Sequence, residues 1–202
     1  MSMKRIITSF VVVLCAIASV SAQSAEQWLQ KLNNSLGERY SMNLSVMVGE
    51  GDTMDGFFMV DGDGYYITLG VMEVYSDGEL RYEVNNQRKE VVEDRVDLEA
   101  CDLLSNPTRA FDFVPSEFRS EVISAANERV VLKLTPKSDA MGISSITLTL
   151  AVAGSKVEPK SISYDYDGEM VNISLTKLDS ADTQLRKWDK TAYRAYDIVS
   201  FL

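Results

Sequence analysis

The sequence has no histidine, two cysteines, four prolines and no glycine-rich phosphate loop. Without histidine, the commonest general base and the commonest zinc ligand are missing, which excludes Ser-His-Asp and Cys-His catalytic constellations. Cys15 falls in the N-terminal apolar run, so Cys101 is the only cysteine of the remaining chain. No intrachain disulfide is therefore expected there, and the fold must depend on its apolar core.

The carboxylates that accompany glycine are best explained as turn residues. The Asp61-Gly62-Asp63-Gly64 stretch has the one-three spacing of a calcium loop, but Met72 stands where the bidentate glutamate belongs. We therefore predict no catalytic residue, no metal site and no cofactor. An enzyme is the alternative to a non-catalytic protein, namely a hydrolase that acts on lipid through carboxylates, although no single Asp or Glu stands out as its catalytic residue. The aspartates concerned are Asp52, Asp55, Asp61, Asp63, Asp77 and Asp167.

The N-terminus has the pattern of a secretory signal peptide. Lys4 and Arg5 precede an apolar run over residues 6–20, and a small-residue site ends at Ala22. The run is short for a membrane span, and Leu14 before Cys15 does not suit lipid attachment. We expect export with cleavage after Ala22, which leaves residues 23–202 as a single domain.

The chain that remains after cleavage is strongly acidic. Removing Lys4 and Arg5 leaves 18 basic against 30 acidic side chains, a net charge of −12. This charge argues against nucleic acid and against anionic membrane surfaces as partners.

Apolar periodicity predicts one helix followed by strands. Residues 25–40 place Trp28, Leu32, Leu36 and Tyr40 four apart, as on one face of an amphipathic helix. Alternating apolar residues then predict about six strands up to residue 92. An irregular apolar insert follows at residues 102–118, which we interpret as short helices or a loop. At least three further strands follow it, two of them joined at Asp167-Gly168.

Hairpin connections such as Asp77-Gly78 imply antiparallel order. An antiparallel sheet of this size must curl or close, and its apolar face needs a cover. The helix and the irregular insert are the candidates for that cover. We therefore predict an α+β fold, mainly antiparallel β, with a curled sheet.

Methionine is frequent in the strand-like runs. Seven of the nine methionines follow the signal peptide, at positions 42, 47, 54, 59, 72, 141 and 170. Flexible, polarizable methionines occur on surfaces that accept varied apolar partners, but they also fill ordinary cores. The sequence leaves both interpretations open.

Four motifs occur in an order that resembles the outer-membrane lipoprotein carrier (LolA) family, especially its Bacteroidetes-type members. They are SDGELRYEVNNQRKEVV (76–92), SNPTRAF (105–111), VVLKLTPKS (130–138) and SISYDYDGEMVNISL (161–175). The resemblance implies an incomplete β-barrel whose concave apolar face is covered by short helices. It also implies a periplasmic, non-enzymatic, monomeric carrier that shelters lipoprotein acyl chains or another lipid. The loading partner would be an inner-membrane lipoprotein-releasing transporter, with an unknown acceptor at the outer membrane.

The resemblance also implies site residues. The acyl-chain cavity would be lined by Leu44, Val46, Phe58, Val60, Tyr65, Ile67, Leu132, Ile146, Leu148, Ile162 and Ile173. The face of residues 57–60 is ambiguous by one residue. The lid would contain Leu104, Pro107, Phe111 and Phe113. For each of these residues a plain core role is the alternative.

One departure concerns the lid. The family carries an arginine before its aromatic strand that ties to the lid, where this chain has Asp61-Gly62-Asp63-Gly64. The same architecture also serves envelope-stress sensors, so a regulatory module that receives a partner polypeptide is the alternative function.

Overall fold

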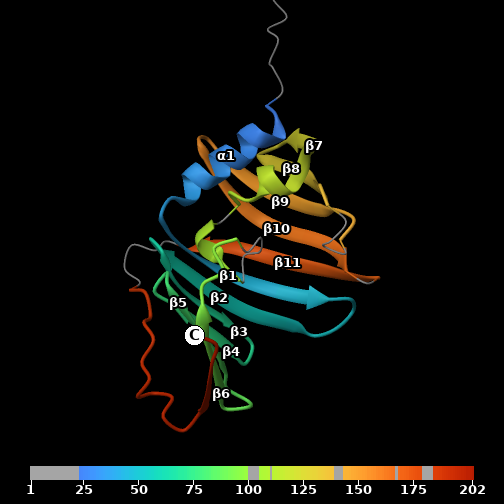
Figure 1. The fold of residues 1–202 in the computed structure, drawn as a ribbon. Coiled ribbons are helices and arrows are strands. Elements are labelled where there is room, and N and C mark those ends of the chain that lie inside the picture. The colour runs from blue at the N-terminus through green and yellow to red at the C-terminus, as the bar shows by residue number, and fades with distance from the viewer. Residues whose placement is uncertain (1–22, 100–104, 110, 139–142, 167, 179–183) are drawn as a thin grey trace, which may run out of the picture.

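The computed structural model describes residues 23–99, 105–109, 111–138, 143–166, 168–178 and 184–202. The predicted signal peptide (1–22) lies outside these ranges, as do Cys101 and Leu104. Within them the chain forms one large curved sheet with short helices on its concave side (Figure 1).

The sheet is open and almost entirely antiparallel. The strand order is β12-β6-β5-β4-β3-β2-β1-β11-β10-β9-β8-β7, so β12 and β7 are the edges and the barrel does not close. Only the β12–β6 pair is parallel among the described pairs. The predicted incomplete barrel is confirmed. The strands are β1 Arg39–Val48, β2 Thr53–Asp61, β3 Gly64–Leu69, β4 Met72–Ser76, β5 Leu80–Asn85, β6 Glu90–Arg95, β7 Phe118–Ala126, β8 Arg129–Pro136, β9 Ile146–Ala153, β10 Lys156–Tyr166, β11 Glu169–Leu178 and β12 Asp197–Ser200.

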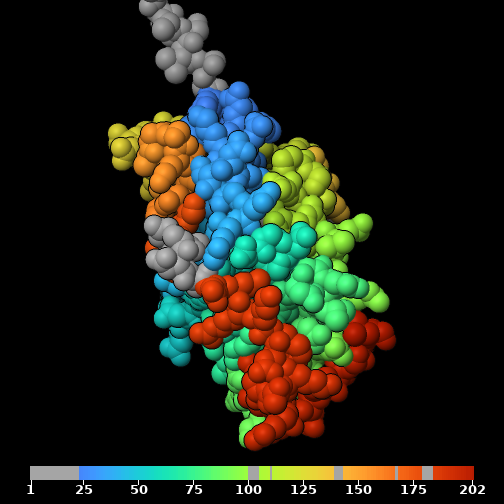
Figure 2. Space-filling model, turned by 90° about the vertical axis from the view of Figure 1, so that its left-hand side faces the viewer, coloured from blue at the N-terminus to red at the C-terminus, as the bar shows by residue number. Residues whose placement is uncertain are grey.

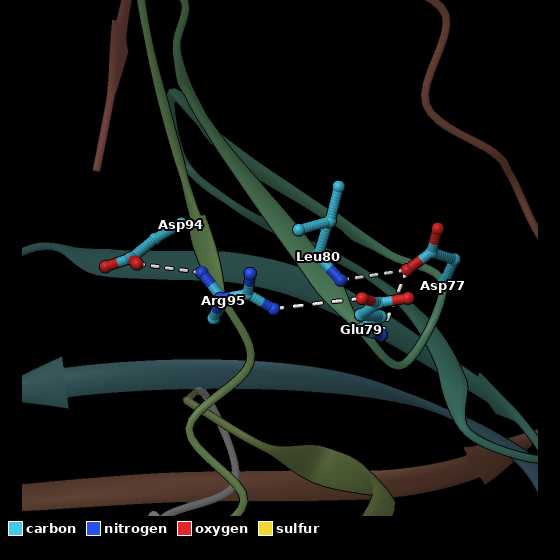
Figure 3. A network of polar contacts seen from close by, with 5 residues as sticks. All are labelled: Asp77, Glu79, Leu80, Asp94 and Arg95. Carbon is cyan, nitrogen blue, oxygen red and sulfur yellow. Dashed lines mark hydrogen bonds and ion pairs between the residues drawn. The ribbon is translucent and has the colours of Figure 1, made fainter. Parts of the chain in front are cut away.

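The predicted hairpin at Asp77-Gly78 joins β4 to β5, as Figure 3 shows. Gly78 has a φ of 97°, and the Asp77 carboxylate accepts the backbone N–H groups of Glu79 (3.0 Å) and Leu80 (2.9 Å). These backbone hydrogen bonds lower the pKa of Asp77. Arg95 of β6 lies 3.7 Å from the Glu79 carboxylate. Asp77 is thus the turn residue that its position beside glycine predicts.

The first helix, α1 (Ala25–Leu36), is shorter than predicted. Ser24 caps it, because its hydroxyl accepts the N–H of Gln27 while the Gln27 side chain accepts the N–H of Ser24. Gly37, with a φ of 69°, ends it. The prediction that the helix extends to Tyr40 is wrong, since Tyr40 lies in β1 and only by coincidence continues the four-residue spacing.

The irregular insert contains two short helices, as predicted. They are η1 (Pro107–Arg109) and α2 (Val114–Glu117). Figure 1 shows α1 and η1 on the same side of the sheet, α1 beside β7–β10 and η1 nearer β1–β3. The apolar side chains of α1, and Val114 of α2, share the main core with that side of the sheet. We call this side the concave face and the opposite side the convex face.

The C-terminal segment (184–202) crosses the convex face and ends as β12 on the edge of β6. Its Trp188 stacks on Tyr82 with ring centroids 4.5 Å apart, and Tyr193 stacks on the other side of Trp188 at 5.0 Å. Tyr66 and Tyr75 join this second cluster from the sheet. Figure 2 shows the segment, in red, gathered over green strands at the end of the molecule away from α1.

Candidate functional site

The predicted cavity residues all lie on the concave face. Strand register shows this directly, because Val46 pairs with Ile173, Ile173 with Ile162, and Ile162 with Leu148. Directly paired residues point to the same side of a sheet. By the same criterion, every predicted cavity residue lies on the concave face, and each one belongs to the main core or packs against it. These residues are Leu44, Val46, Phe58, Val60, Tyr65, Ile67, Leu132, Ile146, Leu148, Ile162 and Ile173.

Register also resolves the ambiguity in β2. Phe58 pairs with Met42 and Ile67 and lies in the main core, whereas Phe57 packs against the cluster on the convex face. Met59 alternates with Phe58 and therefore lies on the convex side as well.

Burial of the concave face falls off toward one end of the strands. Ile146, Ile162 and Ile173 are half-buried, while the other predicted cavity residues are buried. Beyond them the same face continues to Val48 and Met54, which are 37% and 44% exposed. Tyr166, two residues after Tyr164 on β10, is 51% exposed. We call Val48, Met54 and Tyr166 the apolar rim.

Residues 105–109 and 111–113, which contain three of the predicted lid residues and which we call the lid, cover the other end of the concave face. Pro107, Phe111 and Phe113 are buried, and the two phenylalanines belong to the main core. The structure thus brings these predicted lid residues together with the predicted cavity residues. The fourth predicted lid residue, Leu104, lies outside the described residues.

Two tyrosine hydroxyls connect the sheet to the lid backbone. Tyr40 of β1 donates to the carbonyl oxygen of Pro107, and Tyr65 of β3 donates to that of Ser105 at 3.1 Å. Burial and the negative charge of Asp112 raise the pKa of Tyr40, so its hydroxyl stays protonated and able to donate. The lid is therefore tied to the barrel without the family's arginine.

Further polar contacts fix the lid from its sides. The Asn33 amide of α1 donates to the Asp112 carboxylate. The Arg109 guanidinium donates to the carbonyl oxygen of Glu99 at 3.1 Å and lies 5.8 Å from the ring centre of Phe113. Each of these hydrogen bonds involves one charged group, but both are exposed to solvent, which weakens their contribution to stability.

The sequence patterns did not reveal the tyrosine ties. They assigned Tyr40 to the helix and Tyr65 only to the apolar lining. A signal was present, because Gly37 is a typical helix end and the alternation of β1 extends back to Tyr40.

Buried side chains of the main core occupy much of the concave face among the described residues. Two pockets lined by described residues lie on the convex side, beside the C-terminal segment, and a third is lined mainly by convex-side residues of β1, β2 and β11. None of these three opens on the concave face. A ligand there would have to displace the lid or repack the half-buried side chains near the rim.

Neither a metal cluster nor a membrane-spanning helix is found in the described ranges. No group of three or more Cys, Asp or Glu side chains in them could hold a metal ion. No helix in them is long and apolar enough to cross a membrane.

Taken together, the fold and the site define a class: an open antiparallel half-barrel whose apolar concave face is closed by helices. Among solved structures, the chain is similar to an uncharacterized conserved protein from Thermus thermophilus, with a TM-score of 0.54 and 8% identity over 87% of this chain and 98% of that one. This likeness shows a shared fold. Comparison of the sequence with protein-family profiles and with curated proteins gave no match.

Other solved structures are similar at lower TM-scores, and one of them carries the name of the family that the sequence motifs resemble. One is the LolA superfamily protein NE2245 from Nitrosomonas europaea, with a TM-score of 0.40 and 10% identity over 85% of this chain and 98% of that one. Another is the MucA/MucB complex of Pseudomonas aeruginosa, with a TM-score of 0.37 and 14% identity over 82% of this chain and 59% of that one. The incomplete barrel itself follows from the strand order of this chain, and neither the family nor the function of these proteins is transferred by such distant likeness.

Proposed function

We propose that this protein is a periplasmic carrier that binds the acyl chains of lipoproteins on its concave face and escorts them from the inner to the outer membrane. The observation that supports the proposal most is the continuity of one apolar face. It runs from the lid-covered core, past the half-buried Ile162 and Ile173, to the exposed apolar rim. An acyl chain that enters at the rim would meet apolar side chains along its whole path.

A comparison of free energies supports a lid that opens when an acyl chain binds. Transfer of an acyl chain of about 15 methylenes out of water is favourable by roughly 12 kcal/mol, at about 0.8 kcal/mol per methylene. The tyrosine hydrogen bonds to Pro107 and Ser105 stabilise the closed lid by only about 2 kcal/mol together. A bound chain can therefore compensate for breaking them, and the closed face can refill with its own side chains after release.

The proposal includes partners but no chemistry on the cargo. An inner-membrane lipoprotein-releasing transporter would load the carrier, and an acceptor at the outer membrane would receive the cargo. The carrier would act as a monomer, without cofactor or metal, and its acidic surface would disfavour adsorption to anionic membranes.

Native mass spectrometry of the protein purified from the periplasm tests the proposal. The wild type should carry an acylated mass, and Ile173→Glu should lose it, because the change places a charge on the half-buried concave face. The matched control is Ser174→Glu, the next residue of β11, which is exposed on the convex face. This control should retain the adduct.

A protein that carries no acylated mass and extracts no lipoprotein from membranes would overturn the proposal. Capture of a membrane-anchored signalling protein by such a ligand-free form would instead support the regulatory alternative.

A further inference from the structure

A small apolar pocket lies on the convex face, on the opposite side of the sheet from the proposed acyl-chain site. Two cross-strand pairs of β2 and β3 form its floor: Phe57 opposite Thr68, and Met59 opposite Tyr66. Gln184 and Arg186 of the C-terminal segment complete the lining. Its volume is about 340 Å³, within the range of small-ligand sites.

Arg186 is the charged group of this pocket. Its guanidinium carbon lies 5.1 Å from the centre of the Tyr66 ring, and its Nη1 donates to the Tyr66 hydroxyl at 3.1 Å. These contacts orient the guanidinium through one ring and one hydroxyl. Arg186 forms no ion pair with any carboxylate of the described ranges. The guanidinium thus makes no direct ion pair among those residues, although the Glu73 carboxylate attracts it from the other side of the Tyr66 hydroxyl.

The nearby carboxylate of Glu73 is already satisfied. Its oxygens accept hydrogen bonds from the hydroxyls of Tyr66 (2.8 Å) and Tyr75 (2.7 Å) and from the amide of Asn86 (2.7 Å). Glu73 therefore orients Tyr66, which in turn orients Arg186, and its own negative charge stays on the far side of the Tyr66 hydroxyl from the guanidinium.

We propose that this pocket binds a singly charged apolar carboxylate, such as a short aliphatic or aromatic acid. The acid's apolar part would lie against Phe57 and Met59, and its carboxylate would accept the remaining N–H groups of Arg186. A guanidinium matches a carboxylate in geometry and charge. With a single cation present, a monoanion suits the pocket better than a doubly charged phosphate. The Thr68 hydroxyl and the Gln184 amide are the polar groups left to orient the ligand.

Isothermal titration calorimetry with octanoate tests this site, with the Ile173→Glu variant as the host protein. In the Ile173→Glu variant the proposed acyl-chain site on the concave face is disrupted, so octanoate should not bind there. The result of the titration therefore does not depend on the proposed carrier function. Octanoate should bind with a dissociation constant at least about tenfold lower than that of uncharged 1-octanol. 3-Phenylpropanoate in a parallel titration tells whether the pocket prefers an aliphatic or an aromatic acid.

Variants assign the binding to the pocket. Arg186→Met keeps the apolar stem of the side chain but removes its charge. It should raise the dissociation constant of octanoate at least about tenfold and leave that of 1-octanol unchanged. Thr68→Phe should block both ligands by filling the pocket. Thr176→Phe is the matched control, since it adds the same ring on the convex side of β11, outside this pocket. No octanoate binding, or equal binding by the host and its Arg186→Met derivative, would overturn the proposal.

Discussion

At the scale of single residues, two tyrosines hold the concave face closed. Tyr40 and Tyr65 each combine a buried ring, which belongs to the main core, with a hydroxyl that reaches the lid backbone. A buried ring with a polar end is well suited to this task, because it contributes apolar burial and one directional hydrogen bond. The two hydroxyl oxygens therefore contribute to the closed state, and substitution can remove them without leaving a large cavity.

The change to test is Tyr65→Phe, alone and together with Tyr40→Phe. Each removes one hydroxyl and should cost about 1 kcal/mol of stability in the closed lid. Amide hydrogen exchange of residues 105–109 should therefore become about five-fold faster for each substitution. Uptake of lipid should also become faster, since opening costs less.

The control for this pair is Tyr166→Phe, which removes a hydroxyl from the exposed rim, away from the lid. It should leave lid exchange unchanged. If Tyr65→Phe and the double variant exchange at the wild-type rate, the hydroxyls do not hold the lid.

At the scale of elements, the C-terminal segment stabilises the outer half of the sheet. Across strands β2–β6 the buried apolar side chains change from one face of the sheet to the other. Near β3 they lie mainly on the concave side, whereas toward β5 and β6 they lie increasingly on the convex side, where Val84 and Val91 are buried. The segment covers this second apolar surface with Trp188, Tyr193 and Tyr196 and adds β12 to the edge. Both faces of the sheet therefore need a cover. The cover of the convex face lies at the β5–β6 end of the sheet, and the cover of the concave face lies elsewhere along it.

Trp188→Ala tests the role of this segment. The indole stacks between Tyr82 and Tyr193, so its removal should lower the free energy of unfolding by about 2 kcal/mol, less than for a fully buried tryptophan. Urea denaturation followed by far-UV circular dichroism gives the value. Lys187→Ala, an exposed neighbour, should change it by less than about 0.5 kcal/mol. An equal effect of the two substitutions would contradict the stacked arrangement.

Local patterns predicted the elements well wherever the determining contacts were local. Alternation predicted the strands that carry the concave residues from Leu44 to Ile173, the family resemblance suggested which of their residues line the cavity, and Asp77-Gly78 predicted its hairpin. The end of α1 was missed because Tyr40 fits two patterns. It lies four residues after Leu36, as in a helix, and two residues before Met42, as in a strand. The C-terminal cover was also missed, because residues 184–196 are irregular and their partners Tyr66 and Tyr75 lie far away in the sequence. Register was needed to place Phe58 rather than Phe57 on the concave face.

At the scale of the whole molecule, the chain is a sheet with two apolar surfaces and two kinds of cover. The concave surface is closed by a lid that two buried phenylalanines and a few hydrogen bonds hold, and it continues to an exposed rim. The convex surface is closed by stacked aromatic rings and a strand pairing. Under the proposed function the concave face is the one that opens, because its apolar surface continues to an exposed rim.

The most direct test of the acyl-chain account is site-specific photocrosslinking in the periplasm. Benzoylphenylalanine is placed at Ile162 in one variant and at Ser163 in another, which are neighbours on β10 that point to opposite faces. The account predicts crosslinks to acylated proteins from position 162 and none from position 163. Crosslinks to acylated proteins from position 163 alone, or from neither position in a folded protein, would contradict it.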